Sequence, residues 1–306
     1  KWGYDPFKWD NHSFLDPDND GLQNIEEEFM EEWLADPYQP EIYIECDYSA
    51  DPPDERFLGF IPYKIEIKKG KIIPIKRPAI SKAKYTGQEI KFWEESQAML
   101  MERFNQHGIT MHIDDGCMNE GGEKLDLISP ENIKSKDYII SGYYKRNFPD
   151  ERKGIFRYIV LVVLGGGWNY NMDYTGRYDT ITASATDIFY SSACNGFAKT
   201  QRAQRVAQAT SLLHELGHSC GYGYLHCGGV DNLTADGSVE TWFDYKSVMN
   251  YLWYGCRLFD YSDGTNGEND CDDWGKIDVG FFQRAPKQYD LEGIAFDFAA
   301  PPINRR

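Results

Sequence analysis

The chain has 306 residues, of which 41% are hydrophobic, 15% aromatic and 26% charged. This composition is that of a folded globular protein with an ample core, and it excludes a disordered chain. The 49 acidic residues outnumber the 32 basic ones and give a net charge of −17, which excludes nucleic-acid binding because that function needs a basic face.

The apolar runs and the cysteines set the expected compartment. The longest apolar run, residues 158–164, is far too short for a membrane span. Seven cysteines, several in loops rich in Gly, Asn and Asp, favour an oxidising compartment, and their odd number leaves at least one thiol unpaired or paired to another chain. Cys46 is expected to be the buried free thiol. Because the chain starts at Lys1 rather than Met, we expect a processed, secreted protein.

Hydrophobic periodicity predicts the elements in chain order. Residues 1–40 are expected to form a separate N-terminal element, with an acidic turn and a helix over about 25–34. The elements predicted after it are a strand at 41–48, a hairpin or strand pair at 63–76, a helix at 88–106 ended by Gly108, a strand at 109–113, a turn at 114–117, a central buried strand at 156–164, a strand at 179–190 and a helix at 200–218.

This order predicts an α+β fold in which a mixed, twisted sheet of the α/β type packs on two long helices. Residues 41–306 would form one domain, with the sheet and helices in residues 41–221. Residues 222–306 are irregular and rich in Gly, Asp and Tyr, so we expect them to form a lower subdomain. Long irregular segments that follow a helix often carry site residues.

The most informative motif is HELGH, residues 214–218, at the end of the last predicted helix. Two imidazoles four residues apart project from one helix face, so His214 and His218 can bind one metal ion. Glu215, beside the first of them, lies close enough to activate a water molecule. This combination predicts a catalytic zinc site.

A catalytic Zn²⁺ takes three protein ligands and keeps one open position. Gly221 ends the helix soon after the motif and allows the chain to turn back toward the metal. The predicted third ligand is His226, a neutral imidazole just beyond this break. Asp231 and Tyr224 are the alternatives that the sequence leaves open.

With these residues, the chain resembles the metzincin zinc peptidases, and most closely their pappalysin-like and cytophagalysin-like secreted members. The metzincin signature HExxHxxGxxH is followed downstream by a turn that contains a Met. Here HELGHSCG matches the first part, and SVMNY at residues 247–251 is similar to the turn. The resemblance covers about residues 200–251. The family pattern would place the third His at position 224, so His226 as ligand implies a two-residue insertion.

The resemblance implies a metzincin-like fold and a secreted zinc endopeptidase that cleaves protein or peptide substrates. Glu215 would be the general base and Met249 an apolar floor beneath the zinc. Tyr251 would stabilise the oxyanion or pack in the core near the turn. The alternative function is a non-enzymatic extracellular surface or assembly protein that keeps the fold and the metal, with self-association or attachment to a cell surface.

A second motif, DPDNDGLQNIEE at residues 16–27, has the spacing of an EF-hand loop, with acidic residues at positions 1, 3 and 5, Gly at 6 and Glu at 12. It predicts a structural Ca²⁺, and a solvated acidic turn is the alternative. The predicted ligands are the side chains of Asp16, Asp18 and Asp20, the carbonyl of Leu22 and a bidentate Glu27. The acidic stretch 260–273 is more consistent with a surface loop than with a second Ca²⁺ site.

Two disulfides are compatible with the spacing of the cysteines. One would join Cys220 to Cys227 and close the loop that carries the third zinc ligand. The other would join Cys256 to Cys271, which flank the acidic stretch 260–273.

Overall fold

The structure is a computed structural model of the chain. It describes residues 15–49, 63–68, 71–76, 91–126, 143–152, 154–162, 168–169, 180–184, 201–222, 227–231, 241–254, 258–281, 289–291 and 294–296. Within these ranges, none of the helices combines the length and the apolar character that a membrane crossing requires.

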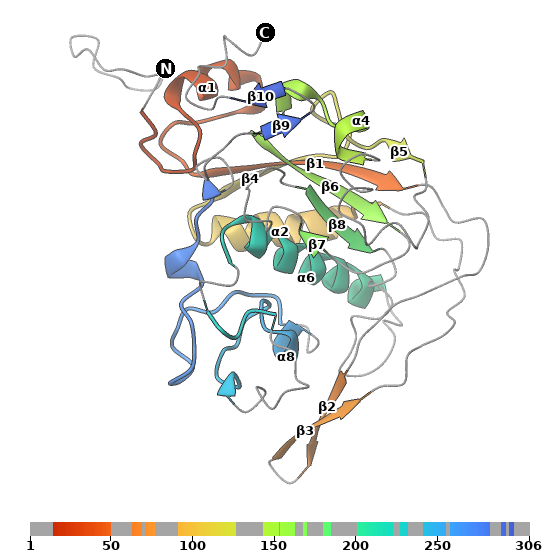
Figure 1. The fold of residues 1–306 in the computed structure, drawn as a ribbon, viewed down its shortest axis with the longest axis vertical. Coiled ribbons are helices and arrows are strands. Elements are labelled where there is room, and N and C mark those ends of the chain that lie inside the picture. Colours follow the sequence, from red (N-terminus) through yellow and green to blue (C-terminus); the bar gives the residue numbers. More distant parts are fainter. Residues whose placement is uncertain are drawn as a thin grey trace.

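A mostly parallel, open sheet lies at the centre of the described residues (Figure 1). Its strand order is β4-β1-β6-β8-β7, and the short β5 also pairs with β1. All these pairings are parallel except β7 with β8, which is antiparallel. The strands are β1 (Glu41–Ser49), β4 (Thr110–Asp114), β5 (Lys124–Leu125), β6 (Phe156–Val162), β7 (Trp168–Asn169) and β8 (Thr180–Ser184).

The two longest described helices, α2 (Glu94–Asn105) and α6 (Gln201–Ser219), lie beneath one face of this sheet (Figure 1). Alternate residues of the central strands point toward the helices, for example Ile44 of β1 and Ile159 of β6. They join one buried cluster with residues of α6 such as Leu212. The prediction of an α+β fold with a sheet on two helices is confirmed at this level.

The opposite face of the sheet is covered by α1 (Asn24–Phe29), the 3₁₀ turn η1 (Glu31–Trp33) and the segment of α4 (Lys145–Asn147) and η3 (Asp150–Arg152). Leu22 and Met30 of the N-terminal segment pack in one cluster with Tyr43, Phe156 and Tyr158 of the sheet. Because β6 is buried on both faces, its residues 158–162 form a continuous apolar run.

Two predicted helices are shorter than expected. The first ends at Phe29 and continues as η1 instead of reaching residue 34. The second begins at Glu94, because residues 91–93 are extended. The side chain of Gln208 in α6 fixes this extended segment, accepting from the Trp93 N–H at 3.1 Å and donating to the Lys91 carbonyl at 2.9 Å. This long-range contact replaces a first helical turn.

The other described elements are peripheral to the sheet. The predicted hairpin is confirmed as β2 (Tyr63–Lys68) and β3 (Lys71–Lys76), which pair antiparallel. A second antiparallel pair is formed by β9 (Tyr289–Leu291) and β10 (Ile294–Phe296). Helix α8 (Tyr251–Tyr254) follows α6 and lies on the side of α6 away from the sheet (Figure 1). The 3₁₀ turn η5 (Trp274–Lys276) comes later in the chain.

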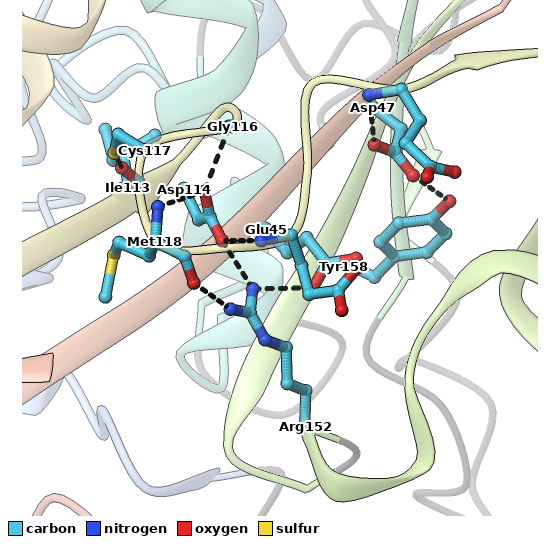
Figure 2. A network of polar contacts seen from close by, with 11 residues as sticks. Glu45, Asp47, Ile113, Asp114, Gly116, Cys117, Met118, Arg152 and Tyr158 are labelled. Atoms are coloured by element: carbon cyan, nitrogen blue, oxygen red, sulfur yellow. Dashed lines mark hydrogen bonds and ion pairs between the residues drawn. The ribbon is translucent and has the colours of Figure 1, made fainter. Parts of the chain in front are cut away.

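A buried charged network stabilises the sheet on the face opposite α2 and α6 (Figure 2). Arg152 is 1% exposed. Its Nη1 lies 2.8 Å from Oε2 of Glu45 and 2.7 Å from Oδ2 of Asp114, and its Nη2 donates to the Met118 carbonyl. Burial raises the pKa of Glu45 to about 8 despite the guanidinium beside it. The network therefore ties β1 and β4 to η3 through one cation.

Candidate metal centre

The HELGH motif lies in the last two turns of α6 and is buried. His214, Glu215 and His218 are 3%, 5% and 6% exposed, so the imidazoles do not belong to a solvated helix face. The ring centroids of His214 and His218 are 5.0 Å apart, as expected for residues one turn apart on one helix face.

Asp231 completes a group of three ligands with the two histidines. Its Oδ1 lies 3.1 Å from Nε2 of His214, and its Oδ2 lies 3.3 Å from Nε2 of His218. These donor atoms lie close enough together to bind one metal ion. The backbone at Asp231 is left-handed, with φ 53°, and its N–H donates to the Met249 carbonyl at 3.0 Å. That hydrogen bond fixes the loop that carries the carboxylate.

The second ring nitrogen of each imidazole, Nδ1, contacts a backbone carbonyl. Nδ1 of His214 lies 2.9 Å from the Val248 oxygen, and Nδ1 of His218 lies 2.6 Å from the Tyr222 oxygen. A carbonyl oxygen can only accept, so each Nδ1 must carry the proton, and each Nε2 presents a lone pair when the ring is neutral. Two lone pairs then face the Asp231 carboxylate, whose Oδ1 accepts no hydrogen bond within the described residues. Such a group of donor atoms could hold a cation.

The Asp231 carboxylate also affects the proton affinity of the first histidine. Burial acts to lower the pKa of His214, but the Asp231 carboxylate, helped by Glu215, overcomes it and raises the pKa to about 9. Burial likewise opposes the effect of the imidazoles on Asp231, which hold its pKa well below the usual range. A divalent ion of the zinc type fits the same position, since two imidazole nitrogens and a carboxylate are established catalytic zinc ligands.

Burial raises the pKa of Glu215 to about 7, against the lowering effect of the two imidazoles. A carboxyl group with a pKa near neutrality can both accept and return a proton. Its position in the sequence places it beside the first ligand. Glu215 is therefore suited to general acid–base chemistry next to the metal position.

The Met-containing turn lies directly against the motif helix. Met249 is fully buried, and a Cβ added at Gly217 would collide with its Sδ and would lie 2.9 Å from Cδ2 of Tyr222. The turn is held by side chains: Ser247 Oγ accepts from the Met249 N–H, and Asn250 Nδ2 donates to the carbonyls of residues 242 and 245. The glycine of HELGH is required by this close approach.

Tyr251 follows the turn and lies over His214. The two rings are stacked, with centroids 5.4 Å apart, and Tyr251 remains 41% exposed. Burial, followed by the negative charges of Asp231 and Glu215, raises the pKa of Tyr251 well above its ordinary value. The phenol therefore stays protonated and able to donate a hydrogen bond.

Both predicted disulfides are wrong. Cys227 pairs with Cys271, and the Cα atoms are 6.3 Å apart. Cys220 is a buried thiol and belongs to the core cluster that contains Tyr222 and Tyr261. The observed bond joins the segment that carries Asp231 to the loop 258–275. The prediction that Cys46 is a buried thiol is confirmed.

The acidic stretch 260–273 is a hydrogen-bonded loop. Both carboxylate oxygens of Asp270 accept from the Ser262 hydroxyl, and Oδ2 also accepts from the Asn266 amide. The Trp274 indole donates to Asp260. Residues 263–265 and 267–269 are exposed, as expected for the surface loop favoured by the sequence.

The predicted calcium loop forms a second acidic group, in which Asp16, Asp18 and Asp20 converge. Asp20 also converges with Glu27 and with Glu41, the first residue of β1. The sequence analysis missed Glu41 because it lies outside the loop motif. The four predicted side chains of the motif thus fall in two groups that share Asp20. The side chain of Leu22 packs in the core, and its carbonyl stays a predicted ligand.

Only some of the residues predicted for the zinc site lie within the described part of the chain. The structure brings His214, Glu215, His218, Met249 and Tyr251 together as the motif suggests. The predicted third ligand His226 and the alternative Tyr224 lie outside the described residues. Asp231, the other alternative, contacts both histidines. Comparisons of the chain with protein-family models, curated proteins and solved structures find no match.

Proposed function

We propose that the chain is a zinc-dependent endopeptidase of metzincin type. One observation carries the proposal: Nε2 of His214, Nε2 of His218 and the carboxylate of Asp231 converge while both Nδ1 atoms are engaged by carbonyls. Hydrogen bonding of a ligand imidazole through its second nitrogen is typical of metal sites, because it sets the tautomer and the ring orientation. His226 stays a predicted additional ligand.

A buried Glu beside the metal position favours hydrolysis over a purely structural metal. When bound, Zn²⁺ supplies a Lewis acid that polarises a carbonyl and lowers the pKa of water. Glu215 then takes a proton from the attacking water and passes it to the leaving amine. Burial raises the pKa of this carboxyl group above its usual range, which favours return of the proton, and a bound cation acts in the opposite direction. A structural metal would gain nothing from this residue.

The surroundings of the motif support the same chemistry. Tyr251 stays protonated and lies against His214, so its hydroxyl can donate to the developing oxyanion. Met249 supplies an apolar, fully buried floor beneath the histidines. The Cys227–Cys271 disulfide is compatible with an extracellular location, where a secreted peptidase would act on protein or peptide substrates.

The decisive experiment measures metal content and cleavage together in the full chain. Zinc is quantified by mass spectrometry, and cleavage of a denatured protein is followed with chelator and after Zn²⁺ is restored. We expect about one Zn²⁺ per chain and activity that chelation removes. Glu215→Gln should keep the zinc and lose about 10²- to 10⁴-fold in activity, the usual contribution of a general base.

Two further variants test the ligand assignment. Replacing a residue that hydrogen-bonds to a metal ligand typically lowers metal affinity by roughly 10- to 100-fold. Asp231→Ala removes a proposed ligand itself and should lower zinc affinity by more than that. Glu102→Gln, on the surface of α2, is the matched control and should change neither zinc content nor activity. Full activity in the Glu215 variant would contradict the proposal. Bound zinc with no cleavage of any substrate would instead favour a surface or assembly protein that retains the metal.

A further inference from the structure

The group of acidic side chains around Asp20 lies far along the chain from the zinc motif and is buried. Asp20 and Glu27 are both 0% exposed. Asp20 belongs to both groups of converging carboxylates, one in the loop and one with Glu27 and Glu41. Burying several carboxylates together costs free energy unless hydrogen bonds or a cation compensate the charge.

Hydrogen bonds compensate only part of this charge. Asp20 accepts from the N–H groups of Leu22 at 2.8 Å and of Glu41 at 3.0 Å. In contrast, neither oxygen of Glu27 has a hydrogen-bond partner within the described residues, although the side chain is fully buried. Asp16 Oδ1 and Asp18 Oδ2 are buried without partners as well. Converging, buried carboxylate oxygens without hydrogen-bond partners are typical of a cation site.

The convergence of these carboxylates also makes their negative charges repel one another. A cation among the oxygens would compensate that repulsion. All the donors are oxygens, so the cation is a hard one, and the loop spacing selects Ca²⁺.

Glu41 differs from the other members of the group. Its Oε2 accepts from the Asp36 N–H and the Tyr43 hydroxyl, and its Oε1 lies 2.8 Å from Nε2 of His112. These contacts engage its carboxylate already. Glu41 is therefore a positioning residue at the rim of the group rather than a primary ligand.

A short segment connects this loop to the end of the zinc helix. The backbone of Gly280 lies against the loop: a Cβ added there would be 2.6 Å from the Asp20 carbonyl oxygen and 2.7 Å from the Gly21 nitrogen. Two residues earlier, the Asp278 N–H donates to the Cys220 carbonyl at 3.1 Å. Residues 278–281, hereafter the bridge segment, thus contact the acidic loop at one end and the residue after α6 at the other.

Two further contacts strengthen this connection. Arg157 of β6 is fully buried, donating from Nη2 to the Val279 carbonyl at 2.5 Å and from Nε to the Ser219 hydroxyl. The ring of Phe281 lies against Gly221, where an added Cβ would be 3.3 Å from Cδ2 of the ring. Ser219 directly follows His218. The bridge segment therefore packs against the end of α6, close to the contact between the Tyr222 carbonyl and Nδ1 of His218.

We propose that one Ca²⁺ ion binds in the acidic loop and that its binding stabilises the His218 end of the zinc site through the bridge segment. The ligands are the side chains of Asp16, Asp18, Asp20 and Glu27. Without the ion, carboxylate repulsion loosens the loop, and the bridge segment loses the surface on which Gly280 packs. The coupling rests on the proposed zinc site, whereas the Ca²⁺ site itself does not.

The first measurement tests the Ca²⁺ site alone. The full chain is stripped of metals and its Tm is followed as CaCl₂ is added, with MgCl₂ as the comparison cation. We expect a rise of about 5 °C at saturating Ca²⁺. Glu27→Gln or the less buried Asp18→Asn should abolish most of the rise, and Glu32→Gln, at an exposed position nearby, should retain it. No rise in the unmodified chain, or an equal rise in all three variants, overturns the site.

The second measurement tests the coupling. The Zn²⁺ dissociation constant is determined by competition with a chromophoric chelator, with and without saturating Ca²⁺. We expect Ca²⁺ to tighten Zn²⁺ binding by about fivefold or more, the lower range of coupling between sites. Phe281→Ala removes the ring that packs against Gly221 and leaves the contact between Gly280 and the loop, so it should keep a Ca²⁺-dependent Tm rise and reduce this ratio toward one. An unchanged Zn²⁺ affinity in the unmodified chain overturns the coupling, whether or not any peptide is cleaved.

Discussion

Gly217, inside the HELGH motif, offers a sharp test of how the Met-containing turn packs on α6. In an exposed helix, replacing Gly by Ala stabilises by about 1 kcal/mol because Ala is the better helix former. Here the new methyl group would collide with Met249 and press on Tyr222. Both neighbours are fully buried, and the Tyr222 hydroxyl is bonded to the Asp273 carbonyl. Neither can move aside freely.

The expected magnitude follows from these two opposing effects. Overpacking a well-packed core costs about 1–3 kcal/mol. Since the clash involves two fixed neighbours, we take the upper part of that range, and the gain in helix propensity offsets about 1 kcal/mol. Gly217→Ala should therefore lower the free energy of unfolding by about 1–2 kcal/mol.

A double-mutant cycle measured by urea unfolding checks the cause. Met249→Ala removes the side chain that the new methyl group strikes, so Gly217→Ala should be less harmful in that background and can even stabilise. Met30→Ala, which opens space on the opposite face of the sheet, is the control background, and there the loss should persist. A stabilising Gly217→Ala in the unmodified chain, or an equal loss in both backgrounds, would refute the packing argument.

Three other expectations concern the proposed activity, the charged network and the disulfide. Glu215 must be ionised to accept a proton, so kcat/KM should fall as the pH drops through the pKa of Glu215. That pKa should lie at or below about 7, because a bound cation lowers it. A flat pH profile with full zinc content would contradict the role of Glu215 as base. Arg152→Met leaves Glu45 and Asp114 buried without their cation and should cost about 3–5 kcal/mol in urea unfolding, and adding Glu45→Gln and Asp114→Asn should recover part of it. Replacing Cys227 and Cys271 by Ser removes a cross-link that spans 44 residues and should cost about 4 kcal/mol, whereas Cys117→Ser should change the stability little.

The sheet and the main helices were predictable because each carries a local signal. The run at residues 158–162 is apolar because both faces of β6 are buried, and α6 has a helical period that ends in Gly221. The start of α2 was not predictable, since Gln208, more than a hundred residues later, holds residues 91–93 extended. Local periodicity contains no trace of such a contact.

The candidate site was likewise predictable only where its residues are close in sequence. His214, Glu215 and His218 share one helical turn, so their spacing alone brings them together. Asp231 reaches them through a loop whose path depends on the Met249 carbonyl and on the Cys227–Cys271 bond. Pairing of cysteines follows proximity in space, and the nearer partners in sequence, Cys220 and Cys256, misled the prediction. Glu41 joins the acidic group because the first residue of β1 lies beside the loop, which only the fold determines.

The left-handed backbone of Asp231 bears on which residues this position can accept during evolution. Asp and Asn adopt such a conformation more readily than most residues, because their short polar side chains bond locally. A Glu would carry the same charge but lacks that preference, and its longer side chain would displace the carboxylate. Asn would keep the backbone and lose the charge. Few substitutions at this position would therefore keep both the backbone conformation and the carboxylate. The conformation of one residue thus limits which side chains the loop can offer to a metal.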